Sequence, residues 1–176
     1  TIIAGSRGKT GAAHLAAAGA LRSGAGLVTV ATPGGCLPIV AAMAPEYMTE
    51  ALPEGKGGSV APGAIDTVLA LEHDVIACGP GLGRDAGVAA FVRTLVDRAT
   101  VPLVLDADAL TVLADDPATL TGREEREIII TPHPGEMARL VGSSVEEVQG
   151  NRIEVAGNFA ASHRVYVVLK GHRTII

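Results

Sequence analysis

Short apolar runs alternate with longer helical segments along the whole chain, and this alternation limits the fold more than any other feature. One helical segment, 86–98, places its apolar residues on a single stripe of the kind that packs against a sheet: Val88, Phe91, Val92, Leu95 and Val96. The alternation predicts an α/β fold of packed layers around a mostly parallel central sheet.

The expected elements follow from residue type and spacing. Strands are expected at 1–4, 27–31, 47–52, 74–78, 102–105, 127–131, 165–170 and 173–176, and helices at 10–23, 35–43, 64–71, 86–98 and 144–162. Ser144 and Glu147 have the spacing of a capping box at the start of the last helix, and Gly24 is well placed to end the first. The glycine- and proline-rich segment 53–63 is expected to be an exposed, mobile loop.

The composition is that of a folded chain with few aromatic residues. Hydrophobic residues make up 48% of the chain, which has 22 glycines but only two Phe, two Tyr and no Trp. The length of 176 residues is enough for one domain with a substantial core. The net charge of −5 and the scarcity of aromatic rings argue against a nucleic-acid surface. No apolar run reaches the roughly 18 residues of a membrane span. Cys36 and Cys78 lie far apart and are expected to be reduced thiols of a cytoplasmic protein.

Gly8, Lys9 and Thr10 resemble the end of a phosphate-binding P-loop. That motif requires an earlier glycine at a fixed spacing, and this sequence has Ile3 in its place. The sequence therefore excludes a P-loop, and the glycine-serine-basic loop before an alanine-rich helix needs another explanation.

Glycine-rich turns or charged side chains directly follow five of the expected strands. These strands lead into Gly5–Gly8, Gly79–Gly83, Asp106–Asp108, Thr131–Glu136 and Lys170–Thr174. Ligands of parallel sheets bind beyond the carboxyl ends of the strands. We therefore expect the five loops to lie along one edge of the molecule and to shape a cleft there.

Each of these residues also has a purely structural interpretation. A glycine-rich loop is often simple turn chemistry, a strand-end aspartate is often a helix N-cap, and Lys170 could be a solvated turn lysine. His133 is harder to explain in this way because the prolines on both sides hold its backbone rigid. His14, His73 and His163 are expected to be ordinary helix or surface residues.

Five stretches of the sequence carry a resemblance that covers essentially the whole chain. They read, in order, GSRGKTGAAHLAAAGALRSGAGLVTVATP, GPGLG, PLVLDADAL, TPHPGEMARL and VVLKGHRTII. This ordered set resembles the ADP/ATP-dependent NAD(P)H-hydrate dehydratases of the ribokinase-like superfamily, with TPHPGE and KGHRT as its most specific parts. The resemblance implies a ribokinase-like, three-layer α/β/α fold with a mostly parallel sheet, formed by one dehydratase domain over 1–176 that is incomplete at both ends.

The resemblance also implies a reaction that repairs the nicotinamide cofactor. Hydrated NADH or NADPH (NADHX or NADPHX) would be dehydrated with ADP or ATP as co-substrate and Mg²⁺ as cofactor, the hydroxyl leaving as phosphate. The implied partners are the hydrated dinucleotide and a fused or separate NAD(P)HX epimerase. We expect a homo-oligomer in which the helix at 10–23 packs against its own sheet or a neighbouring subunit, with no nucleic-acid or membrane partner.

The family's motifs assign roles to individual positions. Contacts to the hydrated dinucleotide are implied for Gly11, Ala12, Ala13, Gly81 and His133. The adenine nucleotide site is implied for Lys170, Gly171, His172, Arg173 and Thr174. By analogy with the acidic Mg-organising motif of the superfamily, Asp106, Asp108 and Glu136 are expected to organise water, metal or the transferred phosphoryl group; no dedicated metal site is expected.

One part of the family pattern is not found in the sequence. In the family a glycine-rich segment ending in Gly-Asp follows the last strand and supplies the catalytic base, so this aspartate is expected beyond Ile176 and the 176 residues alone are expected to show little activity. Two other functions remain open. One is a small-molecule kinase of the same superfamily, where asparagine is more common at the position of His133, and the other is a non-catalytic nucleotide-binding module.

Overall fold

The structure, a computed structural model, describes all residues from 1 to 176 and contains a seven-stranded sheet in which every strand pair is parallel. The strands are β1 (Ile2–Ile3), β2 (Thr29–Pro33), β3 (Met48–Leu52), β4 (Ile76–Cys78), β5 (Leu103–Leu105), β6 (Ile128–Ile130) and β7 (Tyr166–Val167). Their order in the sheet is β3-β2-β1-β4-β5-β6-β7. The chain thus winds outward from β1 to β3 and then crosses to the other side of β1.

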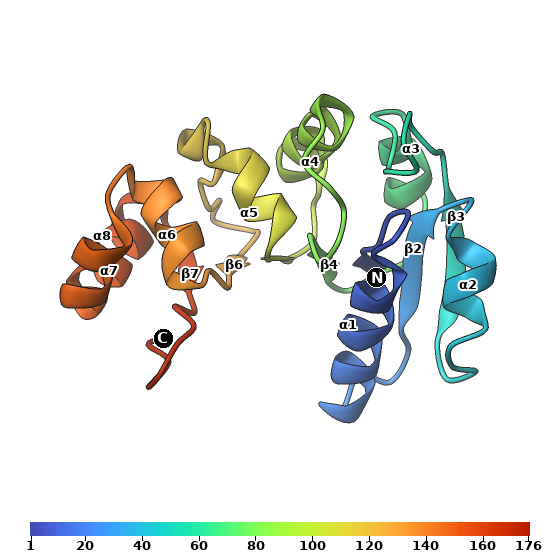
Figure 1. Cartoon of the computed structure of the whole chain (residues 1–176), viewed down its shortest axis with the longest axis horizontal. Coiled ribbons are helices and arrows are strands. Elements are labelled where there is room, and N and C mark those ends of the chain that lie inside the picture. Colours follow the sequence, from blue (N-terminus) through green and yellow to red (C-terminus); the bar gives the residue numbers. More distant parts are fainter.

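Helices cover both faces of this sheet. They are α1 (Thr10–Arg22), α2 (Leu37–Ala41), α3 (Ala64–Leu69), α4 (Ala86–Arg98), α5 (Asp108–Leu113), α6 (Pro134–Val141), α7 (Val145–Gly150) and α8 (Arg152–His163), with a short 3₁₀ turn at Pro117–Thr119. Figure 1 shows α1 on one side of the strands and α3, α4 and α5 on the other. The layered α/β/α architecture expected from the sequence is confirmed.

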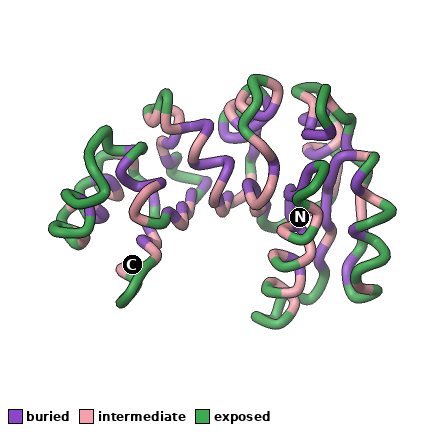
Figure 2. Tube along the Cα trace, in the orientation of Figure 1, coloured by how far each residue is buried: buried purple, intermediate pink, exposed green.

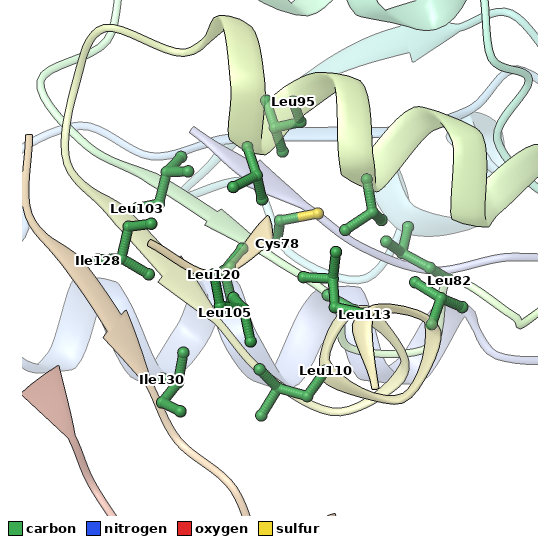
Figure 3. Close-up of a cluster of buried hydrophobic side chains, with 14 of the residues drawn as sticks. Cys78, Leu82, Leu95, Leu103, Leu105, Leu110, Leu113, Leu120, Ile128 and Ile130 are labelled. Carbon is green, nitrogen blue, oxygen red and sulfur yellow. The ribbon is translucent and has the colours of Figure 1, made fainter. Parts of the chain in front are cut away.

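Two apolar cores of unequal size hold the layers together. The larger contains 34 buried residues and joins the strands to helices α3 to α8, whereas the smaller contains eight and lies under α1 and α2. Alternation along the strands produces this division: in β5, Leu103 and Leu105 point into the large core while Val104 is only half-buried on the opposite face. Figure 3 shows Leu103 and Leu105 beside Ile128 and Ile130 of the next strand.

Burial is concentrated in the strands and on the inward sides of the helices, as Figure 2 shows. Helix α4 has the expected bounds, and the five residues of its apolar stripe are all buried. Helix α1 packs on its own sheet through Ala13 and Ala17. Cys36 and Cys78 are both unpaired and buried, as expected.

Two sequence-based expectations about the fold are wrong, and a third holds only in part. The helix expected at 144–162 is two helices, α7 and α8, because Asn151 adopts a non-helical backbone between them; its capping box at Ser144 and Glu147 is confirmed. The strand expected at 173–176 is reduced to one antiparallel bridge that pairs Leu169 with Ile175. In the loop expected to be exposed, residues 58–60 are buried instead.

No helix has the length and the apolar character that crossing a lipid bilayer requires.

Candidate functional site

The sheet order brings the five loops that follow β1, β4, β5, β6 and β7 to one edge of the molecule. These five strands are consecutive neighbours in the sheet and all parallel, so their carboxyl ends point the same way. The direction of winding reverses between β1 and β4, and such a switch point is where open α/β sheets place their ligands. The edge formed by these five loops is called the carboxyl rim below.

The first two loops of the carboxyl rim touch each other at the switch point. The backbone N–H of Gly5 donates to the carbonyl of Pro80 at 2.8 Å, and the hydroxyl of Ser6 donates to the carbonyl of Gly81 at 2.7 Å. A Cβ added to Gly81 would lie 2.9 Å from the Cβ of Ala12, so the loop after β4 packs directly on the start of α1. Backbone therefore lines this part of the rim.

Asp108 links these two loops to the third. Its carboxylate accepts from Lys9 Nζ at 3.2 Å, from Arg84 Nε at 2.8 Å and from the backbone N–H of Gly83 at 3.0 Å. Burial opposes ionisation of Asp108, but these hydrogen bonds outweigh it and hold the pKa of the carboxyl below its ordinary value. Asp108 is thus an ionised hub with a side chain only 9% exposed, while Lys9 and Arg84 reach solvent.

Lys170 links the third, fourth and fifth loops. Its Nζ lies 2.5 Å from Asp106 Oδ1 and 4.0 Å from Glu136 Oε2, and its backbone N–H donates to the carbonyl of Pro132 at 2.8 Å. The carboxylate of Glu136 is buried, whereas the ammonium group of Lys170 is partly open to solvent. The ammonium group of Lys170 is therefore held between two carboxylates at the rim. A solvated turn lysine would have no such fixed partners.

The turn at Asp106–Asp108 separates the two carboxylates into these two clusters. Ala107 between them adopts φ +52°, a conformation that residues with a side chain rarely adopt. Asp106 consequently faces Lys170 and Asp108 faces Lys9 and Arg84. Such local strain is typical of functional sites.

His133 and Glu136 form a reciprocal cap on the N-terminus of α6. The ring Nδ1 of His133 accepts from the backbone N–H groups of Gly135 at 3.0 Å and of Glu136 at 3.3 Å, and Glu136 Oε2 accepts from the backbone N–H of His133 at 2.8 Å. Because Nδ1 is an acceptor, the neutral ring carries its proton on Nε2, which lies 3.3 Å from Glu136 Oε1. His133 and Lys170 therefore both lie beside the carboxylate of Glu136.

The sequence-predicted dinucleotide residues at the start of α1 lie in three different environments. Gly11 is exposed with open space around it, and Ala12 packs against Gly81 at the switch point. The side chain of Ala13 is fully buried in the smaller core, so only its backbone can face a ligand. Their binding roles stay predictions, as does that of His133.

The segment from Lys170 to Thr174 is a tight loop closed by the bridge between Leu169 and Ile175. The two bridge residues exchange backbone hydrogen bonds of 2.9 and 3.2 Å. The four residues after Lys170 are exposed. A cavity of about 520 Å³ lies beside this loop, lined by His172, Arg173 and the junction of α7 with α8. The nucleotide-binding role of the loop likewise remains a prediction.

The residues expected to organise Mg²⁺ fit a site completed by phosphate oxygens. No three acidic, histidine or cysteine side chains gather into a metal cage. Mg²⁺, however, commonly binds through one or two carboxylates together with substrate phosphates and water. Asp106 and Glu136, held on either side of Lys170, offer such a pair, whereas Asp108 is engaged by Lys9, Arg84 and Gly83.

A larger hollow of about 1210 Å³ lies away from the carboxyl rim. It is lined by the amino ends of several strands and by the sheet face beside α1, including Thr1, Val75, Ala77 and Val104. The contacts between the rim loops, and not this hollow, identify the candidate site.

Three contributors to the rim are absent from the sequence-based predictions. Arg84 pairs with Asp108, Arg152 donates to the loop after β7, and Asp85 caps α4 while it accepts from the hydroxyl of Ser59 at 2.7 Å. For Asp85 a signal exists, since an aspartate directly before an apolar helical stripe is a common N-cap. For the two arginines nothing in the local sequence indicates the partner.

Asp85→Ala is expected to lower the free energy of unfolding by about 0.5–2 kcal/mol, because the N–H groups of Gly87 and Val88 lose their acceptor. Urea unfolding measures this, with Asp85→Asn, which keeps an acceptor oxygen, as the control.

Burial raises the pKa of Asp85, but hydrogen bonds from Ser59 and the helix N-terminus outweigh it, so the pKa lies below its ordinary 3.8. The cap's contribution is therefore present above that value and is lost as the pH falls through the lowered pKa. An equal difference between wild type and Asp85→Ala at neutral pH and at strongly acidic pH would contradict this.

Comparison with known proteins places the whole chain in one group. A protein-family model described as NAD(P)H-hydrate dehydratase matches residues 1–176. The bifunctional NAD(P)H-hydrate repair enzyme Nnr of Moorella thermoacetica is 46% identical over 176 residues, which cover 99% of this chain and 33% of that protein. The ADP-dependent (S)-NAD(P)H-hydrate dehydratase of Bacillus subtilis is 34% identical over 177 residues, covering 99% of this chain and 58% of that protein.

The fold comparison agrees with the sequence comparison. A crystal structure of the ADP/ATP-dependent NAD(P)H-hydrate dehydratase from Bacillus subtilis, co-crystallised with ATP/Mg²⁺ and soaked with CoA, is similar with a TM-score of 0.75 and 32% identity. The match covers 98% of this chain and 59% of that one. A ribokinase-like superfamily protein of Enterococcus faecalis matches with a TM-score of 0.76 at 25% identity. The chain thus spans about a third of the bifunctional relative and somewhat more than half of the others.

Proposed function

This chain belongs to the NAD(P)H-hydrate dehydratase family, and from that premise we propose that the protein uses ADP or ATP to dehydrate hydrated NADH or NADPH. Hydroxide is a poor leaving group and phosphate a good one. Transfer of the terminal phosphoryl group to the ring hydroxyl breaks a P–O bond of the nucleotide, forms a P–O bond to the hydroxyl oxygen and releases the hydroxyl proton. In the elimination, the C–O bond breaks, phosphate leaves with the electron pair, and a proton lost from the neighbouring carbon restores the double bond.

The carboxyl rim divides between the two substrates in this proposal. The dinucleotide lies at the switch point between β1 and β4, where Gly11, Ala12 and Gly81 offer close access to backbone. The adenine nucleotide lies beside the loop after β7, from Lys170 to Thr174. The two ligands then meet where His133, Glu136 and Lys170 are brought together.

The contact of Lys170 with both Asp106 and Glu136 is the observation that carries the proposal. Phosphoryl transfer depends chiefly on positioning and on charge stabilisation. We assign the ammonium group of Lys170 to the transferred phosphoryl group, with Asp106 fixing its position. Mg²⁺, when bound through Asp106 and Glu136, would neutralise charge on the phosphate oxygens.

An assay with purified full-length protein tests the proposal. Hydrated NADH is incubated with ADP or ATP and Mg²⁺, and the return of dihydronicotinamide absorbance is followed together with phosphate release. We expect both signals, in equal amounts, and neither signal without nucleotide. A protein that consumed ATP only with a sugar or vitamin alcohol would be the superfamily kinase instead, and nucleotide-dependent stabilisation without turnover would indicate a binding module.

The relatives also bear on partners. Because several matching relatives are bifunctional NAD(P)H-hydrate repair enzymes, we propose that an NAD(P)HX epimerase activity accompanies this dehydratase, fused or separate. A homo-oligomer and a cytoplasmic location remain part of the proposal. Light scattering of the purified protein and fractionation of the cells that make it test these two points.

His133→Asn separates the structural role of this histidine from its proposed binding role. Asparagine is as good an N-cap as any residue, so the stability of α6 is expected to be retained. The imidazole Nε2–H is lost, and affinity for the dinucleotide is expected to fall about tenfold, the cost of one hydrogen bond. Titration with NADH and thermal unfolding measure the two effects. Unchanged affinity would assign His133 to capping alone.

A further inference from the structure

Arg152, the first residue of α8, lies against the loop that follows β7. Its guanidinium donates to three backbone carbonyls of that loop: Leu169 at 3.0 Å, Lys170 at 3.3 Å and His172 at 2.6 Å. We propose that Arg152 is a positioning residue for the adenine nucleotide, acting through the backbone of this loop. The inference rests on the proposed function, which assigns residues 170–174 to that ligand.

The geometry around Lys170 shows what Arg152 fixes. The backbone of Lys170 is held on one side by its N–H bond to the carbonyl of Pro132 and on the other by the bond from Arg152 to its own carbonyl. Its side chain is then free to extend to Asp106. Without Arg152, only the hydrogen bond to Pro132 holds the backbone of Lys170. The position of the ammonium group is then less well fixed.

Gly171 shows how closely the guanidinium approaches the loop. A Cβ at this position would lie 2.9 Å from Nη2 of Arg152, and the backbone has φ +147°, which side chains rarely permit. The turn and the arginine therefore fit each other only when residue 171 is glycine. The three carbonyls all accept from Arg152, which itself lines the cavity of about 520 Å³ beside this loop together with His172 and Arg173.

Arginine is chemically suited to this role. Its planar fork carries five N–H donors, so one side chain can serve three acceptors at fixed angles, whereas lysine is a compact point charge on a flexible stem. The Nε of Arg152 is buried and makes no hydrogen bond, so the guanidinium is placed for the loop carbonyls and not for a surface ion pair. No acidic side chain forms a salt bridge with it.

The test uses full-length protein and two probes, ADP for the nucleotide site and NADH for the dinucleotide site. In Arg152→Ala the dissociation constant for ADP is expected to rise on the order of tenfold to a hundredfold, because a displaced loop misplaces its ligand, while that for NADH stays unchanged. In the dehydration assay the KM for ADP should rise while the KM for hydrated NADH does not. Added guanidinium ion should partly restore ADP binding, and Arg152→Lys should fall between Arg152→Ala and wild type.

The control is Arg139→Ala, which removes an exposed arginine of α6 that makes no side-chain hydrogen bond or ion pair. It should leave both dissociation constants unchanged. Equal weakening of ADP and NADH binding by Arg152→Ala would indicate general destabilisation and overturn the inference, as would unchanged ADP binding. A wild-type protein that bound no ADP would overturn the proposed function as well, so the two failures are distinguishable.

Discussion

Lys170→Met is expected to lower kcat/KM for nucleotide-dependent dehydration on the order of a hundredfold to a thousandfold, the usual cost of removing one preorganised charge-stabilising group. Methionine keeps much of the length of the side chain but removes the cation. The carboxylates of Asp106 and Glu136 would then face the phosphoryl group without the ammonium that lies 2.5 Å from the first and 4.0 Å from the second. Steady-state kinetics with hydrated NADH and ATP measures the effect.

Lys56→Met is the matched control, since Lys56 is an exposed lysine of the loop after β3 and takes part in no ion pair of the structure. It should keep wild-type kinetics. Thermal unfolding of both variants separates a catalytic loss from a folding defect, because the partly exposed Lys170 contributes little net stability. A Lys170→Met enzyme with near wild-type kcat/KM would remove Lys170 from the mechanism.

The sequence predicted well those features that depend on local periodicity. The bounds of α4 and the burial of its stripe follow from residues at helical spacing, whatever the rest of the chain does. The gathering of the five loops at the carboxyl rim also follows from the sequence, because a parallel sheet places the carboxyl ends of all its strands on one side. Strand order was not predictable in this way. That β1 lies between β2 and β4, and so brings Gly5 against Pro80, depends on packing across the whole molecule.

Pairings between distant side chains were the least predictable part of the site. Lys9 and Asp108 lie 99 positions apart in the chain, and neither residue carries a local signal for the other. The cap of α6 is different. His133 and Glu136 have the same spacing as Ser144 and Glu147, the capping box that the sequence predicts. Histidine is an uncommon capping residue, so the sequence indicates a binding motif at His133 and not a helix cap. The break at Asn151 directly follows Gly150, but a single glycine within a helical pattern is often tolerated and does not by itself predict the end of a helix.

Gly79→Ala is expected to have the largest effect on stability of any single substitution at the carboxyl rim. A Cβ there would lie 1.8 Å from the carbonyl oxygen of Asp106 and 2.9 Å from the Cβ of Ala109, and the backbone has φ +136°. The obstacle is backbone and cannot swing away, so β4 and β5 would have to separate at their carboxyl ends. We expect the free energy of unfolding to fall by about 4 kcal/mol or more, the range of severe core disruption. Urea unfolding, or loss of soluble protein, measures this.

Gly19→Ala makes the same chemical change where nothing opposes it. Gly19 is exposed in the middle of α1, with no atom within 4 Å of a built Cβ, so alanine should stabilise the helix by about 0.5–1 kcal/mol. Opposite signs for the two substitutions would show that contact between the loops after β4 and β5, and not glycine content, controls stability here. If Gly79→Ala instead unfolds like wild type, these loops can separate freely. Asp106 would then be too mobile to hold Lys170, and the geometry on which the proposed chemistry depends would not persist in solution.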